Sequence, residues 1–138
     1  MIVIDASVAL KWVLPEEDSH AAQALLEEKL AAPALWLIEA ANALWRHAVA
    51  KRIRINDAKL ALSKLQSAPV AVIPIDNELA RALELSVELR HPIYDCLYLA
   101  VALREDTHVV TADSRFIKAV SHDPVLKKRV RSLGKHSS

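Results

Sequence analysis

The stretch that decides the fold class is IYDCLYLAVALREDTHVVTAD, residues 93–113. Every residue of Cys96–Leu103 is apolar, so a helix formed here has no polar face and is expected to be buried. A strand is predicted at Thr107–Thr111, and a second helix at Ser114–Val120, directly after Asp113. A helix, a strand and a helix in close succession favour a parallel sheet with helices packed on it.

The same alternation continues along the rest of the chain. Met1–Ile4 is short and apolar, which is typical of a strand buried on both faces of a sheet. Further strands are expected at Val70–Ile73 and, at an edge, Val130–Leu133, while Ala32–Ala34 is either a short strand or an extended link. The other expected helices are Ala6–Leu14, Glu16–Leu30, a long helix from Leu37, Asn56–Gln66 and Asp76–Leu89. These elements predict a single α/β domain over residues 1–138, with a mainly parallel sheet of about five strands flanked by helices on both sides.

Composition narrows the class of protein. The chain has 138 residues, 53% of them apolar, which is too apolar for intrinsic disorder. Its single cysteine, Cys96, cannot form an internal disulfide, which favours a reducing cytoplasm. No apolar run approaches the ~20 residues of a membrane span, and no basic segment precedes the first apolar residues, so neither a membrane anchor nor a signal peptide is expected.

Several common kinds of site are excluded by residue counts. A single glycine, Gly134, rules out a Walker loop and a dinucleotide-binding fingerprint. The six histidines are scattered without the spacing of zinc ligands. Cys96 lies in the apolar helix and is interpreted as a core residue rather than a nucleophile.

The net charge is only +1, yet the chain contains two basic segments whose charge is balanced by acids elsewhere. One runs from Arg46 to Lys64, and the other from Lys127 to Lys135. Such segments are either solvated helix faces or surfaces that follow the phosphates of a nucleic acid. If the protein cleaves RNA, they are expected to guide it toward the site.

Three aspartates occupy positions with two interpretations. Asp5 follows the first strand and Asp113 follows the strand at Thr107–Thr111, so each either caps the helix after it or lies in a site at the carboxyl edge of the sheet. Asp95 precedes the buried helix. Burial of its charge needs a cationic partner, either a basic side chain or a metal.

The long helix from Leu37 carries the fourth acid. We expect its apolar stripe to face the core: Leu37, Ile38, Ala41, Leu44, Trp45, Ala48 and Val49. Glu39, Asn42 and Arg46 lie together on a neighbouring face. Glu39 is therefore either a solvated acid that contacts Arg46 or a site acid with Asn42 beside it.

Together the four acids predict a metal site. Two follow strands whose carboxyl ends meet at one edge of a parallel sheet, and two lie on helices that can flank the same crevice. Carboxylates brought this close repel one another unless a cation is present, and a site made only of oxygen ligands suits Mg²⁺ or Mn²⁺.

Four segments in this order resemble the PIN-domain family, and most closely the VapC-type toxins of toxin–antitoxin pairs. They are MIVIDASVALKW at Asp5, LIEAANALWR at Glu39, PIYDCLYLAVAL at Asp95 and VVTADSRF at Asp113. The resemblance implies a Mg²⁺- or Mn²⁺-dependent endoribonuclease that acts as a toxin, forms a homodimer and is inhibited by a cognate antitoxin.

The resemblance also assigns roles to residues. It implies that Asp5, Glu39, Asp95 and Asp113 are catalytic, and we expect Asp5, Asp95 and Asp113 to hold the metal; Ser7 and Thr111 match supporting hydroxyl positions. Some relatives carry a further acid just after the fourth one, where this chain has SRFI, which argues against a complete second metal site. The alternative function is a PIN-like module that binds RNA or a protein without cutting.

Overall fold

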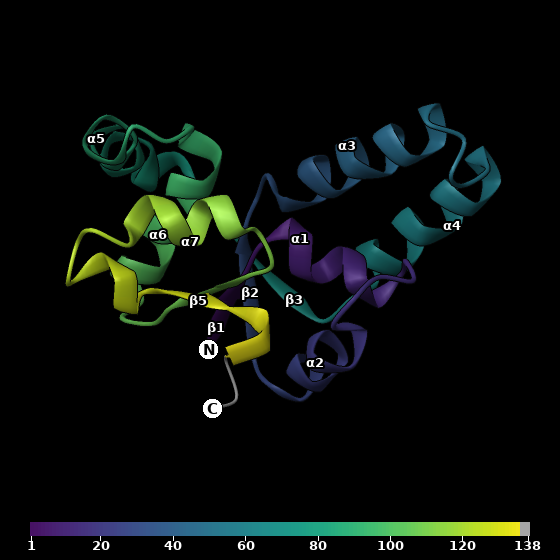
Figure 1. The fold of residues 1–138 in the computed structure, drawn as a ribbon, viewed down its shortest axis with the longest axis horizontal. Helices are drawn as coiled ribbons and strands as arrows, with labels where there is room; N and C mark the ends of the chain where they lie inside the picture. Colours follow the sequence, from purple (N-terminus) through teal and green to yellow (C-terminus); the bar gives the residue numbers. More distant parts are fainter. Residues whose placement is uncertain (136–138) are drawn as a thin grey trace.

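The structure is a computed structural model that describes residues 1–135. The strands are β1 (Ile2–Ile4), β2 (Leu30–Pro33), β3 (Val70–Ile73), β4 (Val109–Thr111) and β5 (Val130–Ser132). The helices are α1 (Ala6–Ala9), α2 (Ser19–Ala24), α3 (Trp36–Val49), α4 (Ile55–Gln66), α5 (Leu79–Leu89), α6 (Ile93–Arg104) and α7 (Ser114–Val120). Short 3₁₀ turns follow α1 and α2, precede α5, and flank β5 (Figure 1).

The five strands form one sheet in the order β3-β2-β1-β4-β5, and all four neighbouring pairs are parallel. The chain builds the sheet outward from β1 through β2 to β3, and then returns to add β4 and β5 on the other side of β1. Strand order therefore reverses between β1 and β4. In open parallel sheets the crevice at the carboxyl ends of two such strands is where ligands bind.

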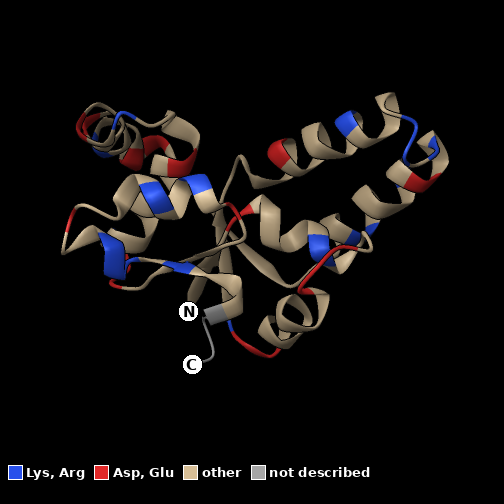
Figure 2. Ribbon diagram, viewed as in Figure 1, with Lys and Arg blue, Asp and Glu red and all other residues tan. Residues whose placement is uncertain are grey.

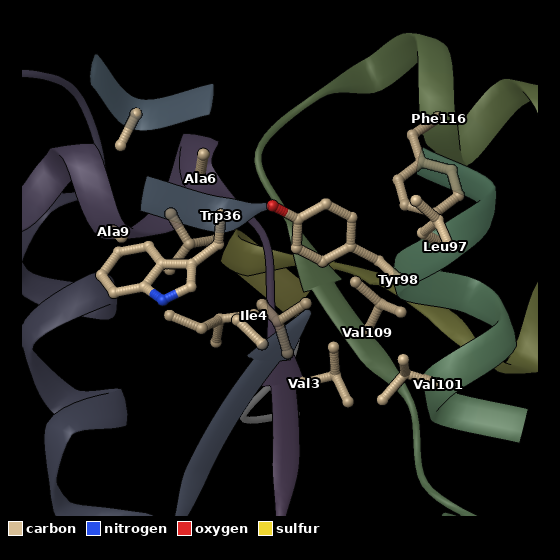
Figure 3. Packing of buried hydrophobic residues seen from close by; sticks show 14 of the residues in the cluster. Val3, Ile4, Ala6, Ala9, Trp36, Leu97, Tyr98, Val101, Val109 and Phe116 are labelled. Atoms are coloured by element: carbon tan, nitrogen blue, oxygen red, sulfur yellow. The ribbon is translucent and has the colours of Figure 1, made fainter. Parts of the chain in front are cut away.

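The core has two sides, because β1 is buried on both faces as its sequence predicts. Successive side chains of a strand point to opposite faces. Figure 3 shows Val3 on the side of Val101 in α6, and Ile4 on the side of Trp36 in α3. Helix α6 contacts β1, β2 and β4, and all residues from Cys96 to Ala102 are buried, which confirms the predicted interior helix.

Helix α3 pairs with α4 in a hairpin that extends to the right of the sheet in Figure 1, while α5, α6 and α7 lie to the left. The face of α3 that is buried differs from the predicted stripe. Trp36, Ala40, Ala43 and Leu44 are buried, because α3 contacts α1 along this side. Of the predicted stripe, Ile38, Trp45 and Val49 are exposed, so that prediction was wrong for these residues.

Two predicted helices are shorter than expected, and one of them is Ala6–Leu14, where α1 ends at Ala9 and a 3₁₀ turn follows to Trp12. The predicted helix Glu16–Leu30 is shorter: α2 ends at Ala24, a 3₁₀ turn follows, and Leu30 begins β2, where it pairs with Ile2 and Val70. The predicted domain extends to Ser138, and its last three residues lie outside the described residues. Within residues 1–135 none of the helices has the length and hydropathy needed to span a bilayer.

Candidate functional site

A pocket of about 540 Å³ lies at the carboxyl edge of the sheet, where strand order reverses. Its floor is the start of α1, one wall is α3, and the opposite wall is the first turns of α6 and α7. The acids that line it are Asp5, Glu39, Asp95 and Asp113. In Figure 2 acidic segments of α3, α1 and the loop before α7 gather around this region. The structure thus brings together the four acids that the sequence singled out.

Asp5 is the most deeply buried of the four, with 5% of its surface exposed. It caps α1, because its Oδ1 accepts the backbone N–H of Val8 at 3.3 Å. The same oxygen accepts the Ser7 hydroxyl at 2.5 Å, and Oδ2 accepts the hydroxyl of Thr111. Burial raises the pKa of Asp5 to about 7, although these hydroxyl donors lower it and the charge of Asp95 raises it further. Asp5 therefore caps α1 and also lies in the pocket, so its two interpretations do not exclude each other.

Ser7 and Thr111 join the ends of β1 and β4. Their hydroxyl oxygens are 3.5 Å apart. The Ser7 oxygen accepts the backbone N–H of Ala112 at 3.0 Å, and the Thr111 oxygen accepts that of Asp113 at 3.0 Å. This network fixes the start of α1 against the loop before α7, so the two hydroxyls position Asp5 and Asp113 relative to each other. Ser7 lines the pocket, while Thr111 is fully buried beneath it.

Asp95 is the electrostatic centre of the cluster. Burial raises its pKa, a hydrogen bond with His91 lowers it, and the charge of Asp113 raises it. The His91 Nε2 and Asp95 Oδ2 atoms are 2.5 Å apart, and the imidazole stacks on the ring of Phe116. The basic side chain that a buried Asp95 was expected to need is therefore supplied, at least in part, by His91.

Glu39 faces the pocket from α3. Its Oε1 accepts the hydroxyl of Tyr98 at 2.6 Å, and in Figure 3 this hydroxyl points away from α6 toward the start of α1. Burial raises the pKa of Glu39, the Tyr98 hydrogen bond lowers it, and the charge of Asp95 raises it. The hydrogen-bond partner of Glu39 is thus Tyr98, whereas the solvated-acid interpretation had Glu39 contact Arg46. Asn42 and Arg46 line the pocket on the same face of α3, as predicted.

Asp113 lies opposite Glu39. It caps α7 by accepting the backbone N–H of Arg115 at 2.9 Å, and its two carboxylate oxygens also face the guanidinium of Arg115. Asp113, like Asp5, therefore caps a helix and borders the pocket at the same time.

Each of the four acids thus accepts a hydrogen bond from its own donor. Their carboxylates are not arranged as the ligands of a metal ion. In the part of the chain that the structure describes, no three Asp, Glu, His or Cys side chains lie close enough together to hold a metal ion. The chemistry of the donors nevertheless fits a hard divalent cation, since all are oxygens and the pocket carries several acids whose charges are partly buried. A bound cation would replace the present hydrogen-bond partners of the carboxylates. Its charge would offset the free-energy cost of burying these groups.

The sequence did not reveal the partners of the acids. His91, Tyr98 and Arg115 each contact a different carboxylate. Only His91 left a signal, because it stands four residues before Asp95 in the sequence, just ahead of the helix whose first turn contains Asp95. Cys96 is buried and free, and burial raises the pKa of its thiol to about 11, consistent with its interpretation as a core residue.

Known proteins share the sequence pattern of this chain. The sequence matches the PIN domain family over residues 2–121. It is 35% identical over 115 residues to a VapC ribonuclease of Mycobacterium bovis and to ribonuclease VapC9 of Mycobacterium tuberculosis, a match that covers 83% of this chain and 87% of each relative.

Solved structures share the fold. PAE2754 from Pyrobaculum aerophilum is similar with a TM-score of 0.74 at 24% identity, over 96% of this chain and 83% of that one. VapC20 of Mycobacterium tuberculosis, described as a sarcin-ricin loop cleaving toxin, is similar with a TM-score of 0.67 at 20% identity, over 86% of this chain and 95% of that one.

Proposed function

The chain belongs to the PIN domain family, and from this premise we propose that it is a Mg²⁺- or Mn²⁺-dependent endoribonuclease that acts as the toxin of a toxin–antitoxin pair. The observation that carries the proposal is the convergence of Asp5, Glu39, Asp95 and Asp113 in one pocket from four different segments of the chain. The ribonucleases named above, at 35% identity, support RNA as the substrate.

In this proposal Asp5, Asp95 and Asp113 hold the divalent cation. When bound, such a cation polarises a phosphate oxygen and lowers the pKa of a bound water. The chain itself supplies the geometry: Ser7 and Thr111 fix Asp5 at the floor, and His91 orients Asp95. Asn42 is a polar neighbour on the wall of the pocket.

We assign Glu39 as the acid that positions the attacking water and accepts its proton. Tyr98 donates to its Oε1 and so fixes the direction of the carboxylate. The raised pKa of Glu39, caused mainly by burial, brings this group closer to the range that suits a proton acceptor at neutral pH.

Cleavage of RNA by the purified chain tests the proposal. We expect cleavage in Mg²⁺ or Mn²⁺, none in excess EDTA, and none by the Asp95→Asn variant in either cation. Asp106→Asn is the matched control, because Asp106 lies on an exposed loop and pairs with Arg129. Equal activity of the Asp95 variant, or full activity in EDTA, would contradict the proposal.

One observation favours a second function. Each carboxylate already has a donor, and no metal cluster is preformed within residues 1–135, as expected of a PIN-like module that binds RNA or a protein without cutting. Thermal unfolding separates the two: a nuclease gains stability as Mn²⁺ is added, because the cation binds the folded state, and the module does not.

The protein partners belong to the same proposal. A cognate antitoxin and a homodimer follow from the toxin role, and structures of similar fold include a toxin–antitoxin complex from Klebsiella pneumoniae. Large apolar side chains exposed on α3, among them Ile38 and Trp45, are of the kind found at protein interfaces. Light scattering of the purified chain tests the dimer: we expect twice the chain mass, and a monomer at all concentrations would contradict it.

A further inference from the structure

A side chain with a permanent positive charge, Arg115, lies in the wall of the pocket. We call this pocket, which is lined by Asp5, Glu39, Asp95 and Asp113, the acid pocket. Arg115 is the second residue of α7, lines the pocket, and has 86% of its side chain exposed. Its Nε lies 3.3 Å from Asp113 Oδ1, and its Nη2 lies 3.4 Å from Asp113 Oδ2. A guanidinium stays protonated at every pH at which proteins fold, so this positive charge is always present beside the four acids.

The contact between Arg115 and Asp113 can be exchanged. Asp113 caps α7 through the backbone N–H of Arg115, so the start of the helix does not depend on the guanidinium. The Arg115–Asp113 contacts are long, at 3.3 and 3.4 Å, and an exposed ion pair of this kind is weak in water. A guanidinium binds a phosphate with the same paired, charge-assisted hydrogen bonds that it makes to a carboxylate, so Arg115 can leave Asp113 for a phosphodiester that enters the pocket.

Positive charge near both the attacking and the leaving oxygen assists phosphodiester hydrolysis. Nucleases with two cations use one for the attacking oxygen and the other for the leaving oxygen. The residues after Asp113 are Ser114, Arg115 and Phe116, so the chain places a basic side chain, and no acid, next to the fourth carboxylate.

We propose that Arg115 is a catalytic residue that contacts a non-bridging oxygen of the scissile phosphate and supplies the charge that a second cation supplies elsewhere. This inference rests on the proposed ribonuclease function. The water oxygen forms a bond to phosphorus while the bond from phosphorus to the departing ribose oxygen breaks. The water loses a proton to Glu39, the departing oxygen gains one from solvent, and Arg115 keeps its protons throughout.

Substitutions of Arg115 test this role. Arg115→Gln removes the charge, Arg115→Lys keeps it without the paired donors, and Lys118→Gln removes a charge from the same helix outside the pocket. The readouts are the single-turnover cleavage rate of a randomised 20-nucleotide RNA in Mn²⁺, its Kd in EDTA by fluorescence anisotropy, and the Tm of each variant. The exposed side chain and the intact backbone cap predict an unchanged Tm in all three variants.

We expect Arg115→Gln to lower the cleavage rate about 10²-fold, the size of effect seen when one preorganised donor to a developing charge is lost. Binding in EDTA should weaken less than the rate falls, because the contact strengthens as charge develops. Arg115→Lys should lie between Arg115→Gln and the wild type, and Lys118→Gln should match the wild type.

The dependence of the rate on Mn²⁺ gives a second readout. With Arg115 in the place of a second cation, the wild-type rate should rise with a Hill coefficient of about 1. A coefficient near 2, a rate of Arg115→Gln within threefold of wild type, or an equal loss in Lys118→Gln would each overturn the inference. If the wild type cleaves no RNA in Mg²⁺ or Mn²⁺, the proposed function fails as well; if it cleaves and Arg115→Gln is equally active, only the role of Arg115 fails.

Discussion

The two edges of the sheet carry pockets of nearly equal size and opposite charge. The acid pocket at the carboxyl edge measures about 540 Å³, and a cleft at the amino ends of β4 and β5 measures about 500 Å³. The residues of this amino-edge cleft are Asp106, Thr107, His108, Pro124, Val125, Lys128, Arg129 and Arg131. Figure 2 shows basic positions along β5 and the turn before it.

The difference between the edges lies in burial. At the amino edge the Arg129 guanidinium pairs with Asp106 at 2.8 Å, and Asp106 is exposed to solvent. At the carboxyl edge Asp5 is buried and Glu39 and Asp95 are partly buried, and burial raises the pKa of all three. Burying charged groups costs free energy, and carboxylates with raised pKa values cluster at functional sites. Burial, and not the size of the cavity, therefore singles out the carboxyl edge as the candidate functional edge.

The largest expected difference between the edges is in cleavage. Asp95→Asn removes a charge at the centre of the acid pocket, and we expect it to lower the cleavage rate at least ~10²-fold. Asp106→Asn makes the same chemical change at the amino edge and should leave the rate within twofold. Cleavage assays on both variants in Mn²⁺ measure this, and equal losses would show that the two edges are not functionally distinct.

The second prediction concerns stability and pH. The pKa of Asp5 is raised from 3.8 to about 7, so between these values the folded chain binds more protons than the unfolded chain, and stability falls as pH rises. A shift of this size corresponds to on the order of 4 kcal/mol. Asp5→Asn removes the buried charge and so recovers part of this free energy. The recovery is incomplete, because the amide of asparagine has a single acceptor oxygen for the hydroxyls of Ser7 and Thr111.

Thermal unfolding in EDTA measures this effect. At pH 8 Asp5→Asn should melt above the wild type, and the gain should disappear as the pH approaches 4. A difference in Tm that is the same at pH 8 and pH 4 would show that burial of the Asp5 charge is not the cause.

A smaller effect is expected from Tyr98. Tyr98→Phe removes the hydroxyl that donates to Glu39, and leaving a partly buried carboxylate without its donor should lower the free energy of unfolding by about 1–2 kcal/mol. Because this hydrogen bond lowers the pKa of Glu39, its loss should move the acid limb of the cleavage pH profile to higher pH. Tyr94→Phe, an exposed tyrosine, is the control for stability, and equal changes in Tm would contradict the role of the hydrogen bond.

The smallest effect concerns the basic residues. Arg46 lines the acid pocket, whereas Lys128 lines the cleft at the opposite edge. If RNA follows Arg46, Arg46→Ala should reduce the slope of log rate against log salt by about 1, and Lys128→Ala should not change it. The reverse result would assign the path of RNA to the segment from Lys127 to Lys135.

The sequence predicts the strands and the location of the site because both follow from chain direction. An acid directly after a parallel strand must lie at its carboxyl edge, which places Asp5 and Asp113 without knowledge of packing. For Glu39 and Asp95 the sequence predicted only that their helices can flank the same crevice, since a helix position alone does not say which way a side chain faces the sheet.

Packing decides what the sequence leaves open. Trp36 and Trp45 are alike in type and lie nine residues apart on α3, yet Trp36 is buried and Trp45 is 59% exposed. Trp36 belongs to the hydrophobic core and Trp45 does not, and this difference is set by tertiary packing. The end of α5 at Leu89 was predicted, although the left-handed position after it is filled by Arg90 rather than by glycine.

The Tyr98 partner of Glu39 was unpredictable for the same reason, because the two residues are 59 apart in the chain. Thr111 lies 106 residues from Asp5, and the resemblance to a known family was what pointed to it as a supporting hydroxyl. Such pairs are set by the crossing of elements, not by local spacing. The sequence therefore located the acids, and the structure was needed to show what holds each of them.

A crystal structure of the protein soaked in Mn²⁺, with the anomalous signal of manganese recorded, tests the central claim most directly. We predict a manganese peak in the acid pocket, with carboxylate oxygens of Asp5 and Asp95 at about 2.1 Å, a distance typical of small hard cations. Manganese found only at exposed acids such as Asp106, with the acid pocket free of it at saturating concentration, would contradict the claim.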